Sequence, residues 1–243
     1  MKSVIMDKAS AARAAAERVK EIILDNPKAV IAAAGGRSTM NLYRELVKMC
    51  ENEEVSFEKV SVFLVADFER APLGKYMKDE FIEEFIDRID ISDANVYYLN
   101  SLNYKLYDEV IEAKGGIDLC ILGLGDNCHI GFNEPATPFV STTHAQRLAP
   151  ATRRQYAYLF GSEEAVPENG LTMGIKTLFD AKEQLVLAFG EEKQEAVFKM
   201  FYGRNDSRYP AAFLQIPPDV TVYLDEAAAE QLVSGQPVPG GAE

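Results

Sequence analysis

The sequence of 243 residues has few of the features that mark specialised protein classes. Its three cysteines are irregularly spaced (Cys50, Cys120 and Cys128), which argues against a disulfide scaffold and is typical of a reducing compartment. No run approaches about 18 apolar residues, so we expect no transmembrane helix. The first residues, MKSVIMDKASAARAAAERVK, lack the basic, apolar and cleavage regions of a secretory signal. We therefore expect a cytoplasmic protein.

Basic residues are in the minority, since 25 Lys and Arg stand against 38 Asp and Glu, for a net charge of −13. Nucleic acids and anionic membranes are bound by clustered cations, so we expect neither as a partner. No second His or Cys pair accompanies His129, so no metal site is predicted, and nothing indicates a cofactor. A small anionic ligand remains compatible, because one or two cations and backbone N–H groups can hold a phosphate.

Short apolar runs and amphipathic stretches alternate along the chain. The runs predicted as buried strands cover residues 29–34, 60–65, 95–99, 117–122, 156–160, 184–189 and 220–224. Apolar residues recur at helical spacing over 12–23, 42–49 and 81–89. This alternation predicts a doubly wound, Rossmann-like α/β fold, with a mostly parallel sheet of about six or seven strands and helices on both faces. We expect one domain over residues 1–233 and a flexible tail over 234–243.

The first candidate site follows the predicted strand at 29–34. A glycine pair there lets the backbone turn tightly and approach a ligand, and Ser38 or Thr39 can cap the next helix. The N-terminus of that helix favours an anion, and an arginine in the loop can add a charged contact. The alternative is an ordinary strand-to-helix turn. The candidate phosphate-binding residues are Gly35, Gly36, Arg37, Ser38, Thr39 and, at the start of a later helix, Lys193.

Two other predicted strands end beside residues that can move protons. Asp67 follows one apolar run, where a partly desolvated carboxylate can act as a base; the alternative is a cap, or a surface acid paired with Arg70. His129 lies in a glycine-punctuated loop after another run, and Glu134 can orient its imidazole. The alternative is a histidine satisfied by a backbone carbonyl. Ligands in such sheets bind at the carboxyl ends of the strands, which favours the functional interpretation.

Four segments resemble the glucosamine-6-phosphate deaminase/isomerase family. GGIDLCILGLGDNCHIGFNEP at 115–135 resembles its active-site signature, and LTMGIKTLFDA at 171–181 and FGEEKQEAV at 189–197 resemble two further motifs. Residues 35–43 resemble its phosphate loop, although the Gly-Gly-Arg-Ser form is nearer to that of the related 6-phosphogluconolactonases. The resemblance extends from about residue 10 to about residue 230.

The resemblance implies a sugar-phosphate isomerase/deaminase that converts a hexosamine 6-phosphate, glucosamine or galactosamine, to a ketose phosphate and ammonia. In the family, a histidine supported by a glutamate opens the sugar ring, and these residues match His129 and Glu134. A carboxylate then moves a proton between C1 and C2. The phosphate is held by the loop that matches 36–39 and by the lysine that matches Lys193.

Two family carboxylates are replaced in this sequence. Asn127 stands where the family has an aspartate before the histidine, and a carboxamide cannot take up a proton. Ala66 stands at the first position of the family's DEY strand end, which leaves Asp67 as the predicted base. The family's phosphate-contacting arginine has no clear match, because Arg153 and Arg154 come several residues early. The catalytic candidates are therefore His129, Glu134, Asp67 and Asn127.

Two alternative functions stay open. A hydrolase of the 6-phosphogluconolactonase type is favoured by Gly-Gly-Arg-Ser but weakened by the FNEP sequence after His129. A non-catalytic sugar-phosphate-binding protein is favoured by the two lost carboxylates and opposed by the retained His129 and Glu134. Self-association into a homo-oligomer is also left open.

Overall fold

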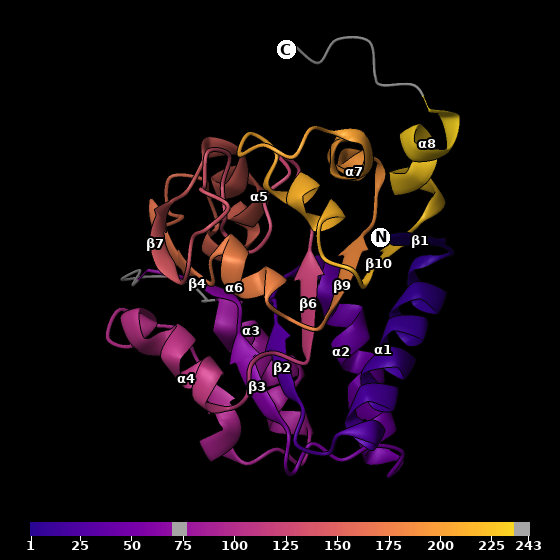
Figure 1. Ribbon diagram of the computed structural model, residues 1–243, viewed down its shortest axis with the longest axis vertical. Coiled ribbons are helices and arrows are strands. Elements are labelled where there is room, and N and C mark those ends of the chain that lie inside the picture. Colours follow the sequence, from indigo (N-terminus) through magenta and orange to yellow (C-terminus); the bar gives the residue numbers. More distant parts are fainter. Residues whose placement is uncertain (70–76, 236–243) are drawn as a thin grey trace.

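A seven-stranded sheet forms the centre of the computed structural model, which describes residues 1–69 and 77–235 (Figure 1). Its strands are, in spatial order, β1 (Lys2–Ile5), β10 (Val220–Leu224), β9 (Glu183–Ala188), β6 (Leu119–Gly123), β2 (Val30–Ala33), β3 (Ser61–Leu64) and β5 (Val96–Tyr97). Every neighbouring pair is parallel. The predicted doubly wound, mostly parallel sheet is therefore confirmed.

Helices cover both faces of this sheet, as predicted (Figure 1). Successive side chains of β2 alternate between the two cores, with Ile31 and Ala33 in one and Val30 and Ala32 in the other. Because both faces are buried, each central strand reads as a continuous apolar run. The first core is built with α1 (Lys8–Asp25), α2 (Arg37–Glu51) and α3 (Met77–Glu84), and the second with α4 (Tyr107–Ala113), α6 (Ile175–Phe179), α7 (Gln194–Tyr202) and α8 (Glu226–Ser234).

The strand order reverses beside β2. The chain proceeds from β2 outward through β3 to β5, and then returns to β6 on the other side of β2. The loops that follow β2 and β6 therefore diverge, which opens a crevice at the carboxyl ends of these strands. Both loops carry residues that the sequence marks as candidates, so the topology brings together the His129 loop and the candidate phosphate-binding loop at residues 35–39, which we call the phosphate loop.

A second sheet stands at the carboxyl end of the first, and the apolar pattern does not predict it. Here β8 (Asn169–Thr172) pairs antiparallel with both β4 (Ala66–Phe68) and β7 (His144–Arg147). Its strands, with the sequences ADF, HAQR and NGLT, are interrupted by polar residues or glycine, so they form no recognisable apolar run. Val65 alone separates β3 from β4, so the small sheet continues directly from the main one.

The strand predicted at 156–160 is wrong, because these residues form the second half of helix α5 (Pro150–Phe160). Their aromatic side chains are typical of strands, but Pro150 begins the helix and Gly161 ends it in the left-handed conformation, with φ of 83°. Thr152 and Tyr156, one helical turn apart, are the buried residues of α5. The helix therefore turns this pair of side chains inward.

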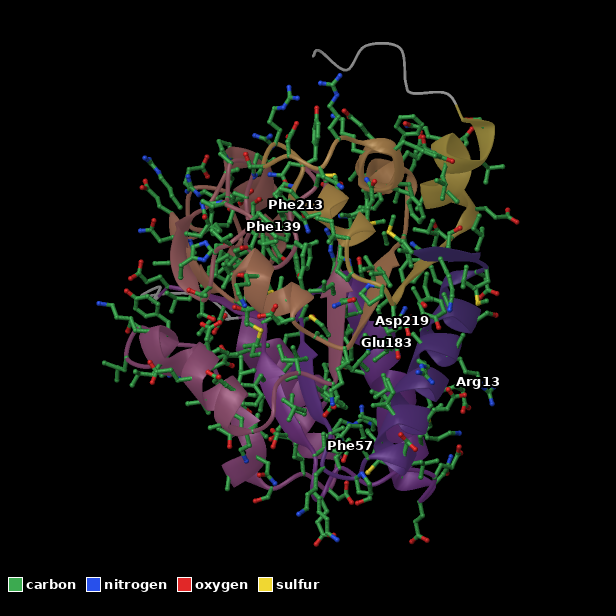
Figure 2. The ribbon with its side chains drawn as sticks, in the orientation of Figure 1. Arg13, Phe57, Phe139, Glu183, Phe213 and Asp219 are labelled. Atoms are coloured by element: carbon green, nitrogen blue, oxygen red, sulfur yellow. The ribbon has the colours of Figure 1, made fainter. Side chains whose placement is uncertain are left out.

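The long connection between β6 and β7 is held firmly in place. The amide of Asn133, which is fully buried, donates to the carbonyl oxygens of Ile130 at 2.9 Å and Met173 at 2.8 Å. Figure 2 shows Phe139 beside Phe213 of η5 (Pro210–Gln215), and their ring centroids are 5.0 Å apart. These contacts fix the segment that contains His129 and Glu134.

The predicted flexible tail overlaps the last helix. Ser234 ends α8, Gly235 follows it in the left-handed conformation, and residues 236–243 lie outside the described residues. The single-domain assignment over 1–233 stays a prediction. Across residues 1–69 and 77–235, no helix is both long enough and apolar enough to cross a membrane.

Gly174 lies in the tightly packed turn between β8 and α6. A Cβ atom there would lie 2.1 Å from the carbonyl oxygen of Ser141 and 2.3 Å from that of Thr142. Rotation of a side chain cannot relieve this clash, because both neighbours are backbone atoms. We expect Gly174→Ala to lower the free energy of unfolding by about 2–3 kcal/mol in urea denaturation.

Gly123→Ala is the matched control. A Cβ atom at Gly123 would lie 3.9 Å from Cβ of Ser38, an ordinary van der Waals contact. We expect the free energy of unfolding of this variant to stay within about 1 kcal/mol of the wild-type value. A similar loss in both variants would contradict the steric explanation.

Candidate active site

The candidate residues lie around two adjoining cavities at the carboxyl ends of β2 and β6. The inner cavity is lined by the phosphate loop, Ala66, His129 and Tyr156, among others. The outer cavity is lined by Lys193, Asp126 and Arg154, among others. Three further residues, Arg37, Ser38 and Gln155, line both cavities together with Tyr156.

The phosphate loop ends in a helix N-terminus that is open to a ligand. Gly36, with φ of 115°, is the N-cap of α2, so the expectation that Ser38 or Thr39 caps this helix is wrong. Thr39 instead occupies the third helical position, and its hydroxyl donates to the carbonyl oxygen of Ala34 at 2.8 Å. Within the described part of the chain, no side chain caps α2, which leaves first-turn N–H groups for an anion.

Cations from four different elements line the outer cavity, and one of them is Lys8 of α1. The Arg37 guanidinium lies 4.7 Å from the ring centroid of Tyr158. Lys193, in η4 (Glu191–Lys193), is 5% exposed and forms an ion pair with Asp126. Arg154 lines the same cavity. Five predicted phosphate-binding residues (Gly35, Gly36, Arg37, Ser38 and Thr39) therefore line the inner cavity, and Lys193 lies in the outer one beside Arg37 and Ser38.

Of the two arginines near the expected phosphate position, only Arg154 lines a cavity. Arg153 donates from Nε to the carbonyl oxygen of Val166 at 3.2 Å and from Nη2 to that of Glu163 at 2.9 Å. These bonds tie α5 to the segment that follows it. Arg153 therefore stabilises the fold, while Arg154 is the arginine of α5 that lines the outer cavity.

A hydrogen-bonded chain connects Glu134 to His129 through Asn127. Nδ2 of Asn127 donates to Oε2 of Glu134 at 2.8 Å, and Oδ1 of Asn127 lies 2.7 Å from Nδ1 of His129. A carboxylate only accepts hydrogen bonds, so Asn127 must present its amino group to Glu134 and its oxygen to His129. Nδ1 of His129 therefore carries the proton, and Nε2 is left as the acceptor.

Glu134 acts on the imidazole mainly through this chain. The distance between its Oε2 and Nδ1 of His129 is 3.9 Å, too long for a hydrogen bond. Its other carboxylate oxygen accepts from the backbone N–H of Ala149, the N-cap of α5, at 3.0 Å. Glu134 is 3% exposed, and the hydrogen bonds from Asn127 and Ala149 offset the cost of burying its charge.

Burial keeps His129 neutral. The imidazole is 3% exposed, and this desolvation lowers its pKa below the usual 6.5, against the opposing effect of the Glu134 charge. A Cβ atom at Gly125 would lie 2.3 Å from the imidazole ring, so only glycine lets the ring lie against this backbone. The site therefore holds a neutral imidazole with a defined tautomer at neutral pH.

Cys128 is a structural residue of the His129 loop. It has φ of 70°, the left-handed conformation that glycine adopts most easily. Its thiol donates to the carbonyl oxygen of Ala196 at 3.3 Å, and burial raises its pKa to about 12. A thiol with such a pKa is not a nucleophile at neutral pH.

Helix α5 contributes residues that sequence reasoning missed. Oγ1 of Thr152, a fully buried residue, lies 3.1 Å from Nδ1 of His129, and Tyr156 forms part of the wall of both cavities. The prediction of a strand at 156–160 concealed this pair, because only a helix through both residues places Thr152 and Tyr156 on the same face. The Pro150 and Gly161 signals bracket an eleven-residue helix and could have revealed it.

Asp67 lies behind the wall of the inner cavity. It is 2% exposed, and one of its carboxyl oxygens accepts from the backbone N–H of Phe68 at 2.9 Å. Its neighbour Ala66 lines the cavity instead, and no carboxylate is found among the described residues of that lining. Desolvation raises the pKa of Asp67 to about 7. Arg70, the alternative ion-pair partner, lies outside the described residues.

Residues 6–223 match the family model described as glucosamine-6-phosphate isomerases/6-phosphogluconolactonase. The chain belongs to this family. The match covers both cavities and the segments that surround them, so the whole candidate site lies within the family domain.

Several known proteins are similar over most of their length. A glucosamine-6-phosphate deaminase of Bacillus velezensis (strain DSM 23117) is 37% identical over 224 residues, which cover 88% of this chain and 92% of the relative. One of Clostridioides difficile (strain 630) is 34% identical over 226 residues, which cover 90% and 91%. The solved structure of a monomeric glucosamine-6-phosphate deaminase matches with a TM-score of 0.90 at 31% identity, covering 95% of this chain and 99% of that one.

A more distant structural neighbour shows only that the fold is shared. The 6-phosphogluconolactonase of Thermotoga maritima matches with a TM-score of 0.71 at 19% identity, covering 92% of this chain and 99% of that one. The isomerase/deaminase branch is therefore nearer to this chain in both sequence and structure.

The raised pKa of Asp67 predicts that stability depends on pH. Between pH 3.8 and about 7 the folded protein keeps this carboxyl protonated while the unfolded chain ionises it, so stability falls as pH rises. Asp67→Asn removes this loss, which amounts to about 4 kcal/mol across the interval. We expect the variant to be more stable than the wild type at pH 8 and equally stable at pH 4.

Urea denaturation at pH 4, 6 and 8 measures the difference between the two proteins. Subtracting the wild-type curve removes the contribution of every other titrating group. A difference that is the same at all three pH values would show that Asp67 keeps its ordinary pKa in the folded protein.

Proposed function

We propose that the protein is a sugar-phosphate isomerase/deaminase that converts a hexosamine 6-phosphate, glucosamine or galactosamine 6-phosphate, to a ketose 6-phosphate and ammonia. The observation that carries this proposal is the chain from Glu134 through Asn127 to His129, which leaves Nε2 as a proton acceptor beside an anion-binding loop. The relatives named glucosamine-6-phosphate deaminase support the same substrate class.

In this proposal the phosphate binds where the two cavities meet. The N–H groups at the start of α2 and the hydroxyl of Ser38 donate to its oxygens. Arg37, Arg154 and Lys193, which belong to three different elements, supply positive charge to the outer cavity. The sugar then extends into the inner cavity toward His129.

His129 opens the sugar ring. Its Nε2 takes the proton of the C1 hydroxyl and delivers a proton to the ring oxygen as the bond from C1 to that oxygen breaks. The Nδ1 proton stays bonded to Asn127, which holds the imidazole in the required tautomer throughout. Glu134 stabilises the transient imidazolium through the same amide.

A proton then moves from C2 to C1, and water replaces the amine at C2. We propose Asp67 as the proton carrier, because its pKa of about 7 suits a group that both takes and gives a proton. The burial of Asp67 behind Ala66 restricts its access to the substrate. We therefore expect slow turnover on ordinary hexosamine phosphates.

The same proposal includes the cofactor, the cellular compartment and the partners of the enzyme. The reaction consists of proton transfers and hydrolysis, so it requires no metal or cofactor. Three free cysteines, two of them buried, support a reducing cytoplasm. A partner other than the sugar phosphate is not needed, and self-association into a homo-oligomer stays a prediction.

Replacing His129 tests the ring-opening step. We expect His129→Asn to lower kcat for ammonia release from glucosamine 6-phosphate by about 10²–10⁴-fold, the usual contribution of one general acid–base group. In the wild type, the activity should fall on the acid side below about pH 7, where Asp67 becomes protonated; burial lowers the pKa of His129, so protonation of the imidazole should add to this loss only below pH 6.5.

His144→Asn is the matched control, since His144 is partly exposed in β7 and lines neither cavity. Its kcat should equal the wild-type value. Activity of His129→Asn close to that of the wild type would remove His129 from the mechanism.

Placing a carboxylate on the cavity wall tests the proton carrier. Ala66 lines the inner cavity, so Ala66→Asp should raise kcat for ammonia release at least about tenfold. Ala66→Asn, with a side chain of the same size, cannot carry the proton and should not raise it.

Asp67→Asn completes this comparison. Loss of activity in Asp67→Asn, together with no gain in Ala66→Asp, would show that Asp67 already reaches the substrate efficiently. Full activity of Asp67→Asn would exclude Asp67 as the carrier.

One observation favours hydrolysis of a 6-phosphogluconolactone as a second candidate function. The lining of the inner cavity, as far as the described residues go, includes His129 and no carboxylate, and one base is enough to activate a water molecule. Acid release from the lactone, without ammonia release from any hexosamine phosphate, would replace the proposed function. Binding without any turnover would identify a sugar-phosphate-binding protein.

A further inference from the structure

We propose that Asp126 is an internal competitor for the substrate phosphate at Lys193, and that it thereby sets which anions the outer cavity accepts. The proposal deepens the proposed function and rests on it in one respect, namely that the ligand of Lys193 is a phosphate. Asp126 itself is one of the outer-cavity residues, three positions before His129.

The two partners come from adjacent strand ends. Asp126 lies in the loop after β6, and Lys193 lies in η4 after β9, and these strands are paired in parallel. The Lys193 side chain is 6% exposed and its Nζ donates to Oδ1 of Asp126. A buried ammonium group requires an anionic partner, and in the described structure Asp126 fills that position.

The burial of the pair is strongly asymmetric. The side chain of Asp126 is 42% exposed, against 6% for Lys193. The carboxylate can therefore turn into solvent at little cost, whereas the ammonium group cannot follow it. An anion that enters the outer cavity thus exchanges with Asp126 and leaves Lys193 in place.

The exchange favours anions that carry more negative charge and more acceptor oxygens than a carboxylate does. A phosphate monoester carries about two negative charges and three acceptor oxygens. It can contact Lys193 while it also accepts from the start of α2 and pairs with Arg37. A singly charged sugar carboxylate replaces Asp126 with an equivalent group and gains little. Asp126 therefore selects phosphate esters against sugar acids.

Isothermal titration with inorganic phosphate tests this competition without any sugar. We expect Asp126→Asn to bind phosphate about tenfold more tightly than the wild type. This figure corresponds to an ion pair that is stronger than a fully exposed one and weaker than a fully buried one. Glu192→Gln is the matched control, because Glu192 lines the same cavity and its removal changes the net charge equally. Its affinity should stay within about twofold of the wild type.

A second background shows whether the effect passes through Lys193. In a Lys193→Met protein, adding Asp126→Asn should change phosphate affinity by less than about twofold, because no ammonium group remains for which Asp126 and phosphate can compete. Acetate, a singly charged carboxylate, tests the selectivity for phosphate over carboxylates. It should bind measurably to Asp126→Asn, and in the wild type it should displace phosphate only weakly. Asp126→Ser serves as a second variant if Asp126→Asn unfolds at a lower temperature.

Phosphate affinity of Asp126→Asn and Asp126→Ser equal to or below the wild-type value would overturn the proposal. An equal gain in Glu192→Gln, or a gain that persists in Lys193→Met, would also overturn it, because the effect would then be general electrostatics. Ammonia release is measured separately. A wild type that shows the phosphate competition but releases no ammonia keeps this proposal and rejects the deaminase function.

Discussion

The position of β6 and β3 on opposite sides of β2 determines where everything else in the site can lie. The crevice between the diverging loops is the one place where the N-terminus of α2, the His129 loop and the start of α7 can face a common ligand. Ala66 of the small antiparallel sheet and Tyr156 of α5 line the inner cavity in this crevice. Residues that are distant in the sequence thus meet because of strand order, before any side-chain contact is considered.

Within that crevice, a neutral amide stands between two groups that titrate. Glu134 orients the amide of Asn127, and this amide in turn orients the imidazole of His129 without placing a charge next to it. An aspartate in the same position would favour the imidazolium by Coulomb attraction. The amide instead leaves desolvation as the dominant influence, so the histidine stays neutral and its tautomer is still fixed.

The sequence predicted the parts of the fold and site that follow from local patterns. Strands buried on both faces read as apolar runs, and the loops after them carry Arg37 and His129 as expected. The helix at 150–160 was also predictable from local signals, because Pro150 and Gly161 fix its ends, although its aromatic residues favoured a strand. The orientation of Asp67 was not predictable, because the pairing of β4 with β8 decides which of two neighbouring side chains faces the cavity.

Four residues, Arg37, Ser38, Gln155 and Tyr156, form the common wall of the inner and outer cavities. The imidazole lies on one side of it and the buried ammonium on the other. A ligand that spans the wall must carry its anionic group at the far end of the carbon chain from the carbon that reacts. A sugar phosphorylated at the end opposite its carbonyl can therefore place its phosphate beside Lys193 and its reacting carbon beside His129.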